Sequence, residues 1–310
     1  MTSSTDFILG INIGGTSCSL VAATAAGKIR DRRAWATEEA RDPEDTVRQI
    51  VRLSREMLGG TFYRGAGVAI GGPLDTRTGT VLGPPNLPGW EEVRLKEKLE
   101  GALGLPVLVM HDAAACALAE AVYGHHPEGA RLVYLTCGTG FGAGIVEGGK
   151  PMKGTAGVHP EIGHWQLLAE GPEAFGRAGS AEAFCSGRGF TRIAAWRYPE
   201  RWGKTPPEPE EITRLAREGD TEALGVVDFQ CRMTGRVCAM VAELICPDRI
   251  LLGSLATHLG TFWVDRVQNH YRSEVLERIG SAVDVLPCRL GERLQDLSAV
   301  AVGMAAAAGD

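Results

Sequence analysis

In residues 7–23 the sequence reads FILGINIGGTSCSLVAA, two short apolar runs joined by glycines and a threonine. Apolar and β-branched runs of this length favour strands, and a glycine-rich break between them favours a tight turn. We therefore expect a β-hairpin with strands Phe7–Ile13 and Cys18–Ala23 and a turn at Gly14–Thr16. Such a turn exposes backbone N–H groups that can bind the oxygens of a phosphate.

A second stretch of the same kind lies in the middle of the chain. Leu132–Thr136 and Ala143–Val146 are predicted strands on either side of Gly138-Thr139-Gly140. Neither turn continues as a Walker loop, and neither opens a helix as a dinucleotide-binding fingerprint does. Each turn alone is more typical of a plain hairpin, but the two together, at matching places, indicate a site for nucleotide phosphates.

The rest of the chain alternates between predicted strands and helices. Strands are expected at Gly67–Ile70, Val107–Met110, Arg249–Leu252 and Val283–Leu286, and helices at Pro43–Leu58, Asp112–Tyr123, Glu210–Glu218, Asp220–Glu243 and Leu297–Ala308. Gly59-Gly60 is expected to end the first helix, and Tyr198–Pro209, rich in proline and charge, to form a surface loop. Two α/β units that each open with a hairpin indicate a duplicated fold with a cleft between its lobes.

The length and net charge of the chain exclude some classes of function. A chain of 310 residues with 44% hydrophobic residues has the material for two packed domains. Its net charge of -6 argues against a nucleic-acid binder, which would need a basic surface. No apolar stretch approaches the roughly 20 residues that span a bilayer, and the first residues lack the pattern of a signal peptide. We therefore expect a cytoplasmic protein that binds neither nucleic acid nor membrane.

The cysteines indicate a reducing compartment. The 8 cysteines are scattered and include no Cys-X-X-Cys pair, so we expect reduced thiols that act as small buried apolar residues.

Several ordered motifs resemble the ROK family, which contains bacterial sugar kinases and sugar-responsive repressors. The resemblance runs nearly end to end and rests on Gly10–Thr16, Gly71–Asp75, Pro85–Trp90, His111-Asp112, Gly138–Gly144, Glu161–His164, Glu182 before Ser186-Gly187, and Cys246–Gly253. It implies the two-lobed actin/hexokinase-like, ribonuclease H-like α/β fold with a central cleft. The smaller N-terminal lobe would be residues 1–118 plus about 292–310, and the larger C-terminal lobe residues 119–291.

The resemblance also implies roles for individual residues. Asp112 matches the general base that accepts a proton from the sugar hydroxyl, although an acid at that position also suits a helix N-terminal cap. Sugar binding is implied for Asn86, His111, Asp112, Glu161, His164 and Glu182. Nucleotide binding is implied for Asn12, Gly14, Gly15, Thr16, Gly138, Thr139, Gly140, Gly253 and Ser254.

The sequence departs from the family pattern at two kinds of position. Asn12 stands where the family usually has an aspartate that helps to hold magnesium, so we expect weaker engagement of the metal. The cysteines of the family's zinc motif are replaced by Glu173, Phe175 and Ser180. His164 alone cannot complete a tetrahedral zinc site, so we expect no zinc. Cys185 lies nearby but out of register, and we expect it to be a buried thiol.

These observations leave three functions to compare. The leading one is an ATP- and Mg²⁺-dependent hexose kinase acting on glucose, fructose or an N-acetylhexosamine; His-Pro-Glu at 159–161 resembles the fructokinases of the family. The alternative is a sugar-binding protein whose catalysis is impaired at Asn12. A DNA-binding repressor is disfavoured by the charge and because we expect no helix-turn-helix domain before Phe7. The family also implies a homodimer.

Overall fold

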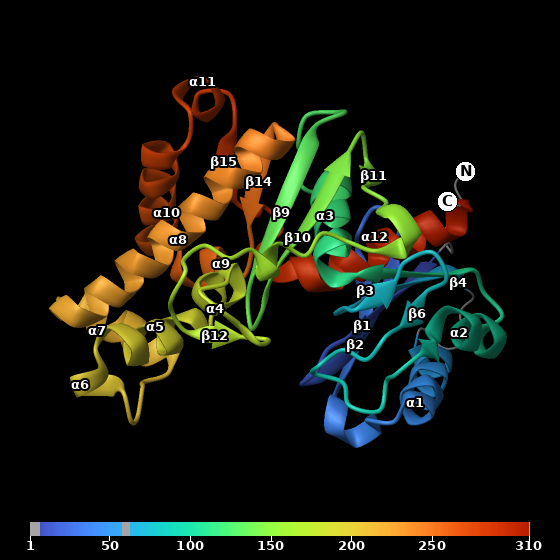
Figure 1. Ribbon diagram of the computed structural model, residues 1–310. Coiled ribbons are helices and arrows are strands. Elements are labelled where there is room, and N and C mark those ends of the chain that lie inside the picture. The colour runs from blue at the N-terminus through green and yellow to red at the C-terminus, as the bar shows by residue number, and fades with distance from the viewer. Residues whose placement is uncertain (1–6, 58–62, 310) are drawn as a thin grey trace. The chain divides into compact units, whose positions relative to one another are not determined.

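The computed structural model describes residues 7–57 and 63–309, which form two compact α/β units (Figure 1). The described residues within 1–129, 144–159 and 292–310 form unit 1, and those within 130–143 and 160–291 form unit 2. Unit 1 is therefore assembled from three separate parts of the chain.

Unit 1 is built on a five-stranded sheet with the order β3-β2-β1-β4-β8. The first two strands form the predicted antiparallel hairpin, while β4 and β8 run parallel to β1. The elements of unit 1 are β1 (Phe7–Ile13), β2 (Ser17–Thr24), β3 (Ile29–Ala36), α1 (Pro43–Glu56), β4 (Tyr63–Ile70), β5 (Leu74–Asp75), β6 (Thr80–Val81), β7 (Val93–Arg94), α2 (Leu95–Leu103), β8 (Val107–His111), α3 (Asp112–Tyr123), β11 (Lys150–Pro151) and α12 (Leu294–Ala308).

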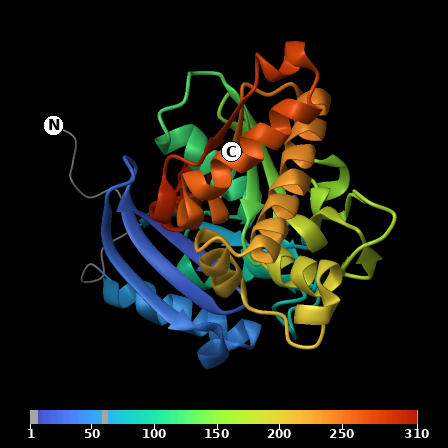
Figure 2. The same cartoon turned by 90° about the vertical axis from the view of Figure 1, so that its left-hand side faces the viewer.

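Successive residues of β1 point to opposite faces of this sheet, because side chains alternate along a strand. Leu9 and Ile11 belong to the buried cluster that also contains Ile50 of α1, whereas Ile8 packs with Val300 of α12 on the opposite face. Figure 2 shows the blue strands of this sheet with α1 lying along one face. Strand β1 is thus buried on both of its faces.

Glycines let α12 approach the sheet at backbone distance. A Cβ atom added to Gly67 of β4 would lie 2.1 Å from the backbone N of Gly303 and 2.2 Å from the carbonyl O of Ala299. No side chain fits at that separation, so the contact between β4 and α12 depends on glycine.

Unit 2 contains β9, β14 and β15, which are neighbouring parallel strands, and a group of helices. The same sheet continues from β9 to β10 (Phe141–Glu147), which runs across the unit boundary, and then to β11. The other elements are β9 (Arg131–Cys137), β12 (Glu173–Ala174), β13 (Arg177–Ala178), α4 (Ala181–Cys185), α5 (Gly189–Arg197), α6 (Pro199–Trp202), α7 (Pro209–Arg217), α8 (Thr221–Ile245), β14 (Arg249–Leu252), α9 (Leu255–Leu259), α10 (Thr261–Glu274), α11 (Glu277–Gly280) and β15 (Asp284–Pro287).

Most strands and helices expected from the sequence are confirmed, with ends that differ by a few residues. The helix expected at Pro43–Leu58 ends as α1 at Glu56, and Leu58 and Gly59-Gly60 lie outside the described residues. The helix expected from Asp220 begins one residue later, because Asp220 is its N-cap and accepts a hydrogen bond from the Ala223 N–H at 2.9 Å.

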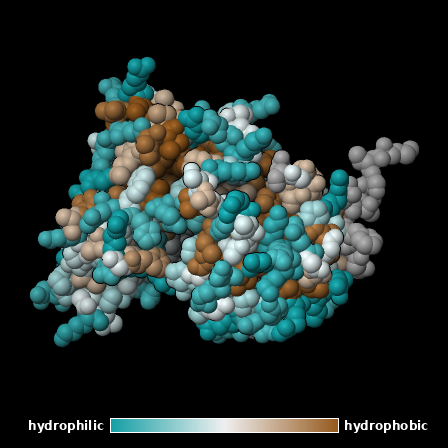
Figure 3. Space-filling view, turned by 45° about the vertical axis from the view of Figure 1, so that its right-hand side comes forward, coloured by the Kyte–Doolittle hydropathy of each residue, from teal (hydrophilic) through white to brown (hydrophobic). Residues whose placement is uncertain are grey.

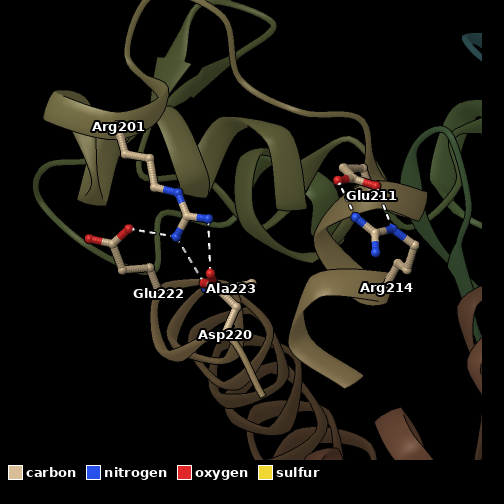
Figure 4. A network of polar contacts seen from close by, with 6 residues as sticks. All are labelled: Arg201, Glu211, Arg214, Asp220, Glu222 and Ala223. Carbon is tan, nitrogen blue, oxygen red and sulfur yellow. Dashed lines mark hydrogen bonds and ion pairs between the residues drawn. The ribbon is translucent and has the colours of Figure 1, made fainter. Parts of the chain in front are cut away.

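The expectation of a loop over Tyr198–Pro209 is wrong in part, because α6 lies within it. Pro199 is the first residue of this helix, where a missing N–H costs nothing, and Trp202 is buried. Arg201 makes ion pairs of 2.9 Å with Asp220 and Glu222, which join α6 to the start of α8 (Figure 4). The charged residues that indicated a loop instead anchor a short helix.

The compact units divide the chain differently from the expected lobes. The expected boundary between residues 118 and 119 falls inside α3, which continues to Tyr123 and packs against α12. Residues 119–129 and 144–159 belong to unit 1.

The cysteines are free, as expected, and all are buried except Cys246, which is exposed. The expectation for Cys185 is confirmed, and burial raises the pKa of its thiol to about 12. In the described part of the chain, no helix is long and apolar enough to cross a membrane.

Candidate active site

Three parallel strands of unit 1 end side by side. Ile13 at the end of β1 pairs with Ile70 at the end of β4, and Ile70 pairs with His111 at the end of β8. The segments that follow these strands are the Gly14–Thr16 turn, Gly71 and Asp112, so they meet at one edge of the sheet. Ligands of open α/β sheets bind at this carboxyl edge.

Asp112 presents an accessible carboxylate at that edge. It is the first residue of α3, its Oδ1 accepts a hydrogen bond from the Ala113 N–H at 2.6 Å, and its side chain is 45% exposed. The N-cap position itself is occupied by His111, so the expected capping role of Asp112 is replaced by a place in the first turn. An acidic side chain in the first turn of a helix interacts favourably with the N-terminal end of the helix dipole.

His111 lies beside this carboxylate and is itself packed by a second histidine. Its Nδ1 is 3.3 Å from Asp112 Oδ1, and its ring centroid is 3.9 Å from that of His159. His159 was not among the residues expected at the site. Its sequence signal was the His-Pro-Glu motif, which by itself does not show that the side chain returns to β8.

The Gly14–Thr16 turn is held at both ends by one buried residue. The Thr37 hydroxyl donates to the Gly14 carbonyl at 2.6 Å, and the Thr37 N–H donates to the Thr16 carbonyl at 2.9 Å. Gly15 and Thr16 are exposed. Sequence reasoning missed Thr37, because no pattern marks a threonine that lies about 20 residues beyond the turn it supports.

Asn86 lies directly against this turn. A Cβ atom added to Gly15 would be 2.5 Å from the Cβ of Asn86. Asn86 itself is exposed. The loop that carries Asn86 is anchored by the buried Trp90, whose indole Nε1 donates to the Arg41 carbonyl at 2.9 Å. The expected phosphate turn and one expected sugar ligand are therefore neighbours within unit 1.

Asn12 precedes the turn on β1 and is half-buried. Its amide Nδ2 donates to the Ser19 hydroxyl on β2 at 3.5 Å. This bond points the NH₂ group toward β2 and leaves the amide oxygen as the acceptor through which Asn12 would engage a hydrated cation.

In unit 2 the second glycine turn contacts the expected adenosine-binding segment. The turn is closed by a hydrogen bond of 3.0 Å from the Gly138 N–H to the Gly140 carbonyl, with Thr139 at its tip. A Cβ atom on Gly138 would lie 3.1 Å from the Ser254 hydroxyl. Ser254 has φ of 38° and ψ of −83°, a strained conformation that follows Gly253.

Glu182 lies under the same turn. It is a buried residue of α4, and its carboxylate accepts a hydrogen bond from the backbone N–H of Phe141, immediately after Gly140. Burial raises the pKa of Glu182, while the Phe141 N–H and the charges of Arg192, His164 and Arg188 act to lower it. The carboxylate therefore lies in a site where an added hydrogen-bond donor, such as a sugar hydroxyl, would stabilise its charged form.

Glu161 and His164 lie on the segment that leads into α4. Both are exposed, and the His164 N–H donates to the Glu161 carbonyl at 3.1 Å in a short 3₁₀ turn over Ile162–His164. A Cβ atom added to Gly163 would lie 3.6 Å from the Cβ of Glu182, so unit 2 brings the 3₁₀ turn that contains His164 close to Glu182.

The positions of the family's zinc cysteines have other uses in this chain. Glu173 lies on β12, Phe175 is exposed, and the Ser180 hydroxyl caps α4 by accepting from the Ala183 N–H at 3.2 Å. Among the described residues, no group of three or more His, Cys, Asp or Glu could hold a metal ion.

A cavity of about 520 Å³ lies elsewhere in unit 1, around Asp75, Glu92 and Arg94. None of the expected site residues lines it. The sheet edge, rather than this cavity, therefore defines the candidate active site of unit 1.

Comparison with known proteins agrees with this geometry. The sequence matches the ROK family over residues 8–309. The chain belongs to the ROK family. It is 31% identical to an N-acetylmannosamine kinase of Escherichia coli O7:K1, over 92% of this chain and 99% of the relative. It is 28% identical to a glucokinase of Halalkalibacterium halodurans, over 91% of this chain and 90% of the relative.

The fold is also that of solved members of the family. A ROK glucokinase from Streptomyces griseus, solved in complex with glucose and AMPPNP, matches with a TM-score of 0.78 and 26% identity. The match covers 96% of this chain and 99% of that chain. The actin/hexokinase-like α/β fold expected from the ROK motifs is confirmed.

Proposed function

We propose that this protein is an ATP-dependent sugar kinase (EC 2.7.1 type) that transfers the γ-phosphoryl group of ATP to a hydroxyl of a hexose. The observation that carries the proposal is the meeting of Asp112 with the Gly14–Thr16 turn at one sheet edge. The related glucokinase and N-acetylmannosamine kinase, and the relative that holds glucose and AMPPNP, support it.

Asp112 acts as the general base. As the hydroxyl oxygen of the sugar bonds to the γ-phosphorus, the bond from phosphorus to the β–γ bridging oxygen breaks and ADP leaves. The proton of the hydroxyl passes to the Asp112 carboxylate and then to solvent. The sugar phosphate, ADP and one proton are the products.

The remaining site residues position the two substrates. Sugar binding is proposed for Asn86, His111 and Asp112 of unit 1 and for Glu161, His164 and Glu182 of unit 2. Nucleotide binding is proposed for Asn12, Gly14, Gly15 and Thr16 of unit 1 and for Gly138, Thr139, Gly140, Gly253 and Ser254 of unit 2. Carboxylates, an amide and imidazoles suit sugar hydroxyls, which both donate and accept hydrogen bonds.

ATP is bound as its magnesium complex, so the ion arrives with the substrate. Asn12, which stands where the family usually has an aspartate, would help to hold the ion through its amide oxygen, which would accept from a water of the magnesium shell but would add no negative charge. We infer that the chain tolerates this loss because the phosphates carry most of the charge that holds the ion.

Among sugars, the relatives favour glucose and N-acetylmannosamine, and fructose stays a candidate through the His-Pro-Glu motif. A homodimer in the cytoplasm, with no nucleic-acid or membrane partner, is part of the same proposal. Figure 3 shows hydrophobic patches on an otherwise mainly hydrophilic face. Leu244 at the end of α8 and Leu276 before α11 are 70% and 65% exposed, which suits burial between subunits.

The test is a coupled assay of ADP release with Mg·ATP and a panel of hexoses and N-acetylhexosamines. Wild type is expected to turn over at least one sugar, and Asp112→Ala to lose that activity by a factor of about 10²–10⁴, the usual contribution of a general base. The matched control is Asp45→Ala, which removes an exposed acid from the first turn of α1 and is expected to leave the rate unchanged.

Asn12→Asp separates the kinase from the alternative of an impaired sugar-binding protein. For a working kinase, the added carboxylate is expected to lower the magnesium concentration required for half-maximal rate. A silent wild type that becomes active as Asn12→Asp would instead establish the alternative. Retained turnover in Asp112→Ala would overturn the proposed role of Asp112.

A further inference from the structure

Arg192 of α5 is a half-buried cation that binds the end of α4. Its Nη1 donates to the Ser186 hydroxyl at 3.3 Å and to the Glu182 carbonyl oxygen at 3.5 Å. The Ser186 hydroxyl donates to the same carbonyl at 2.8 Å. The guanidinium therefore holds the backbone of Glu182 through a direct contact and through Ser186.

The carboxylate of Glu182 continues this chain of contacts to the second glycine turn. It accepts from the Phe141 N–H, and a Cβ atom on Gly140 would lie 3.5 Å from both of its oxygens. The segment after Ser186 also reaches the turn, because the Gly187 N–H donates to the Gly138 carbonyl at 2.6 Å. One arginine is thus connected by two short routes to the turn that we propose binds phosphate.

The charged groups around Glu182 come from three elements. Burial raises the pKa of Glu182, and it lowers the pKa of Arg192, whose charge Glu182 in turn stabilises. Arg192 of α5 and Arg188, the N-cap residue before α5, interact with Glu182, as do His164 of the 3₁₀ turn before α4 and the Cys185 thiol of α4 itself. From α8 the neutral Gln230 donates to the Cys185 carbonyl at 3.1 Å.

We propose that Arg192 is a positioning residue for the sugar kinase reaction: it fixes Glu182 between sugar and glycine turn and supplies the cation that balances its carboxylate. This inference rests on the proposed function, in which Glu182 binds sugar hydroxyls. A purely structural arginine would tie α5 to α4 and leave the ionisation of Glu182 unaffected. A lysine at position 192 separates the positioning role from the purely structural one, because it keeps the positive charge but loses the forked set of guanidinium donors.

The first experiment measures kcat and KM for the sugar between pH 5 and 9 in wild type, Arg192→Met and Arg192→Lys. In Arg192→Met the acid limb of kcat/KM is expected to move to higher pH by about one unit, the usual effect of a nearby opposite charge. Arg192→Lys keeps the limb near its wild-type position and raises only the KM. Arg197→Met is the matched control, because Arg197 lies on the same helix over the ring of Phe229.

The second experiment does not need activity. Carbon-13 NMR of labelled glutamate carboxyls, with the Glu182 signal assigned through Glu182→Gln, follows the titration of this residue in the same variants. Its midpoint is expected to rise in Arg192→Met and to stay at the wild-type value in Arg192→Lys and Arg197→Met. An unchanged midpoint in folded Arg192→Met overturns the inference, whatever the enzyme does.

Ser186→Ala covers the case in which Arg192→Met does not fold. This variant keeps the guanidinium charge but removes the hydroxyl that links it to Glu182, so we expect a higher sugar KM with an unmoved acid limb. A wild-type sugar KM in Ser186→Ala overturns the inference. If wild type turns over no sugar but the Glu182 midpoint still depends on the charge at 192, the proposed function fails and the electrostatic role of Arg192 stands.

Discussion

At the scale of single residues, one buried hydroxyl fixes the shape of the Gly14–Thr16 turn. Thr37 is 3% exposed and donates its hydroxyl proton to the Gly14 carbonyl at 2.6 Å. A valine of the same shape would leave that carbonyl without its donor, at a cost of about 1–3 kcal/mol. The turn would then be free to leave the conformation in which we propose that it binds phosphate.

We therefore predict that Thr37→Val raises the KM for ATP several-fold and changes the KM for the sugar less. Steady-state kinetics with each substrate varied in turn measures both values. Thr213→Val is the control, because the Thr213 hydroxyl makes a comparable bond of 2.9 Å to Glu210 in the first turn of α7. Equal effects of the two variants on ATP would contradict a specific role for Thr37.

The burial of Glu182 predicts how the stability of the protein depends on pH. Burial raises its pKa in the folded state above the ordinary value of 4.5, so the fold favours the protonated acid. Its ionisation then costs stability, and the cost grows as pH rises from the ordinary value through the raised one. Glutamine at this position keeps an acceptor for the Phe141 N–H without the charge.

The expected result is that Glu182→Gln gains stability relative to wild type as the pH increases from about 4.5 to 7. Urea unfolding at several pH values measures the difference in free energy of unfolding. A difference that stays constant over this range would show that Glu182 titrates in the folded protein as it does in the unfolded chain.

The candidate site residues that the sequence indicates are those carried by local motifs. Asp112 and the two glycine turns stand in recognisable patterns at the ends of predicted strands. Thr37, His159 and Arg192 act through contacts with residues distant in the sequence or on another helix. A threonine, histidine or arginine in isolation has many uses, so their roles become visible only when the chain is folded.

At the scale of elements, the contact of α12 with β4 depends on two facing glycines. A side chain on Gly67 would collide with the backbone of Gly303 and Ala299, and one on Gly303 would lie 2.9 Å from the backbone N of Gly67. Backbone atoms in a buried strand and helix cannot move aside as a flexible side chain can. Any larger residue must separate the helix from the sheet.

Gly67→Ala is expected to lower the free energy of unfolding by about 1–3 kcal/mol, the usual cost of overpacking a core. Gly101→Ala is the control on α2, where no atom lies within 4 Å of the added Cβ. That change is expected to stabilise the protein by about 0.5–1 kcal/mol through helix propensity. Equal midpoints of thermal unfolding for the two variants would refute the argument.

The sequence predicts long, strongly patterned elements better than short ones. Phe7–Ile13, Arg249–Leu252 and Asp112–Tyr123 were found with their observed bounds. Strand β3 was missed because its residues are mostly polar and show no apolar alternation. It forms a strand by pairing with β2 at the edge of the sheet. Helix α6 was missed because one turn of helix rests on its tertiary ion pairs rather than on its own propensity.

At the scale of the whole molecule, unit 1 is completed only by the last helix of the chain. Helix α12 packs onto the sheet that contains β1, β2, β4 and β8, and the boundaries of the units therefore do not follow the order of the sequence. Each unit has its own buried residues, including Val300 in unit 1 and Val237 in unit 2. Compact units with separate cores can open separately.

We predict that a cavity in one core loosens only the unit that contains it. Val300→Ala removes two methyl groups from a fully buried side chain that packs with Ile8 and Val21, at a cost of about 1–3 kcal/mol. Hydrogen exchange measured by mass spectrometry should quicken in β1, β4 and α3 and stay unchanged in β9, β14 and α8.

Val237→Ala on α8 is the reciprocal variant, and it should quicken exchange in unit 2 alone. Because both changes remove the same atoms from buried valines, a difference in pattern cannot come from the chemistry of the substitution. If either variant accelerates exchange throughout the chain, the two units unfold as one cooperative body. Selective exchange would instead mean that a site residue such as Asp112 depends for its position on the α12 core and not on the helices of unit 2.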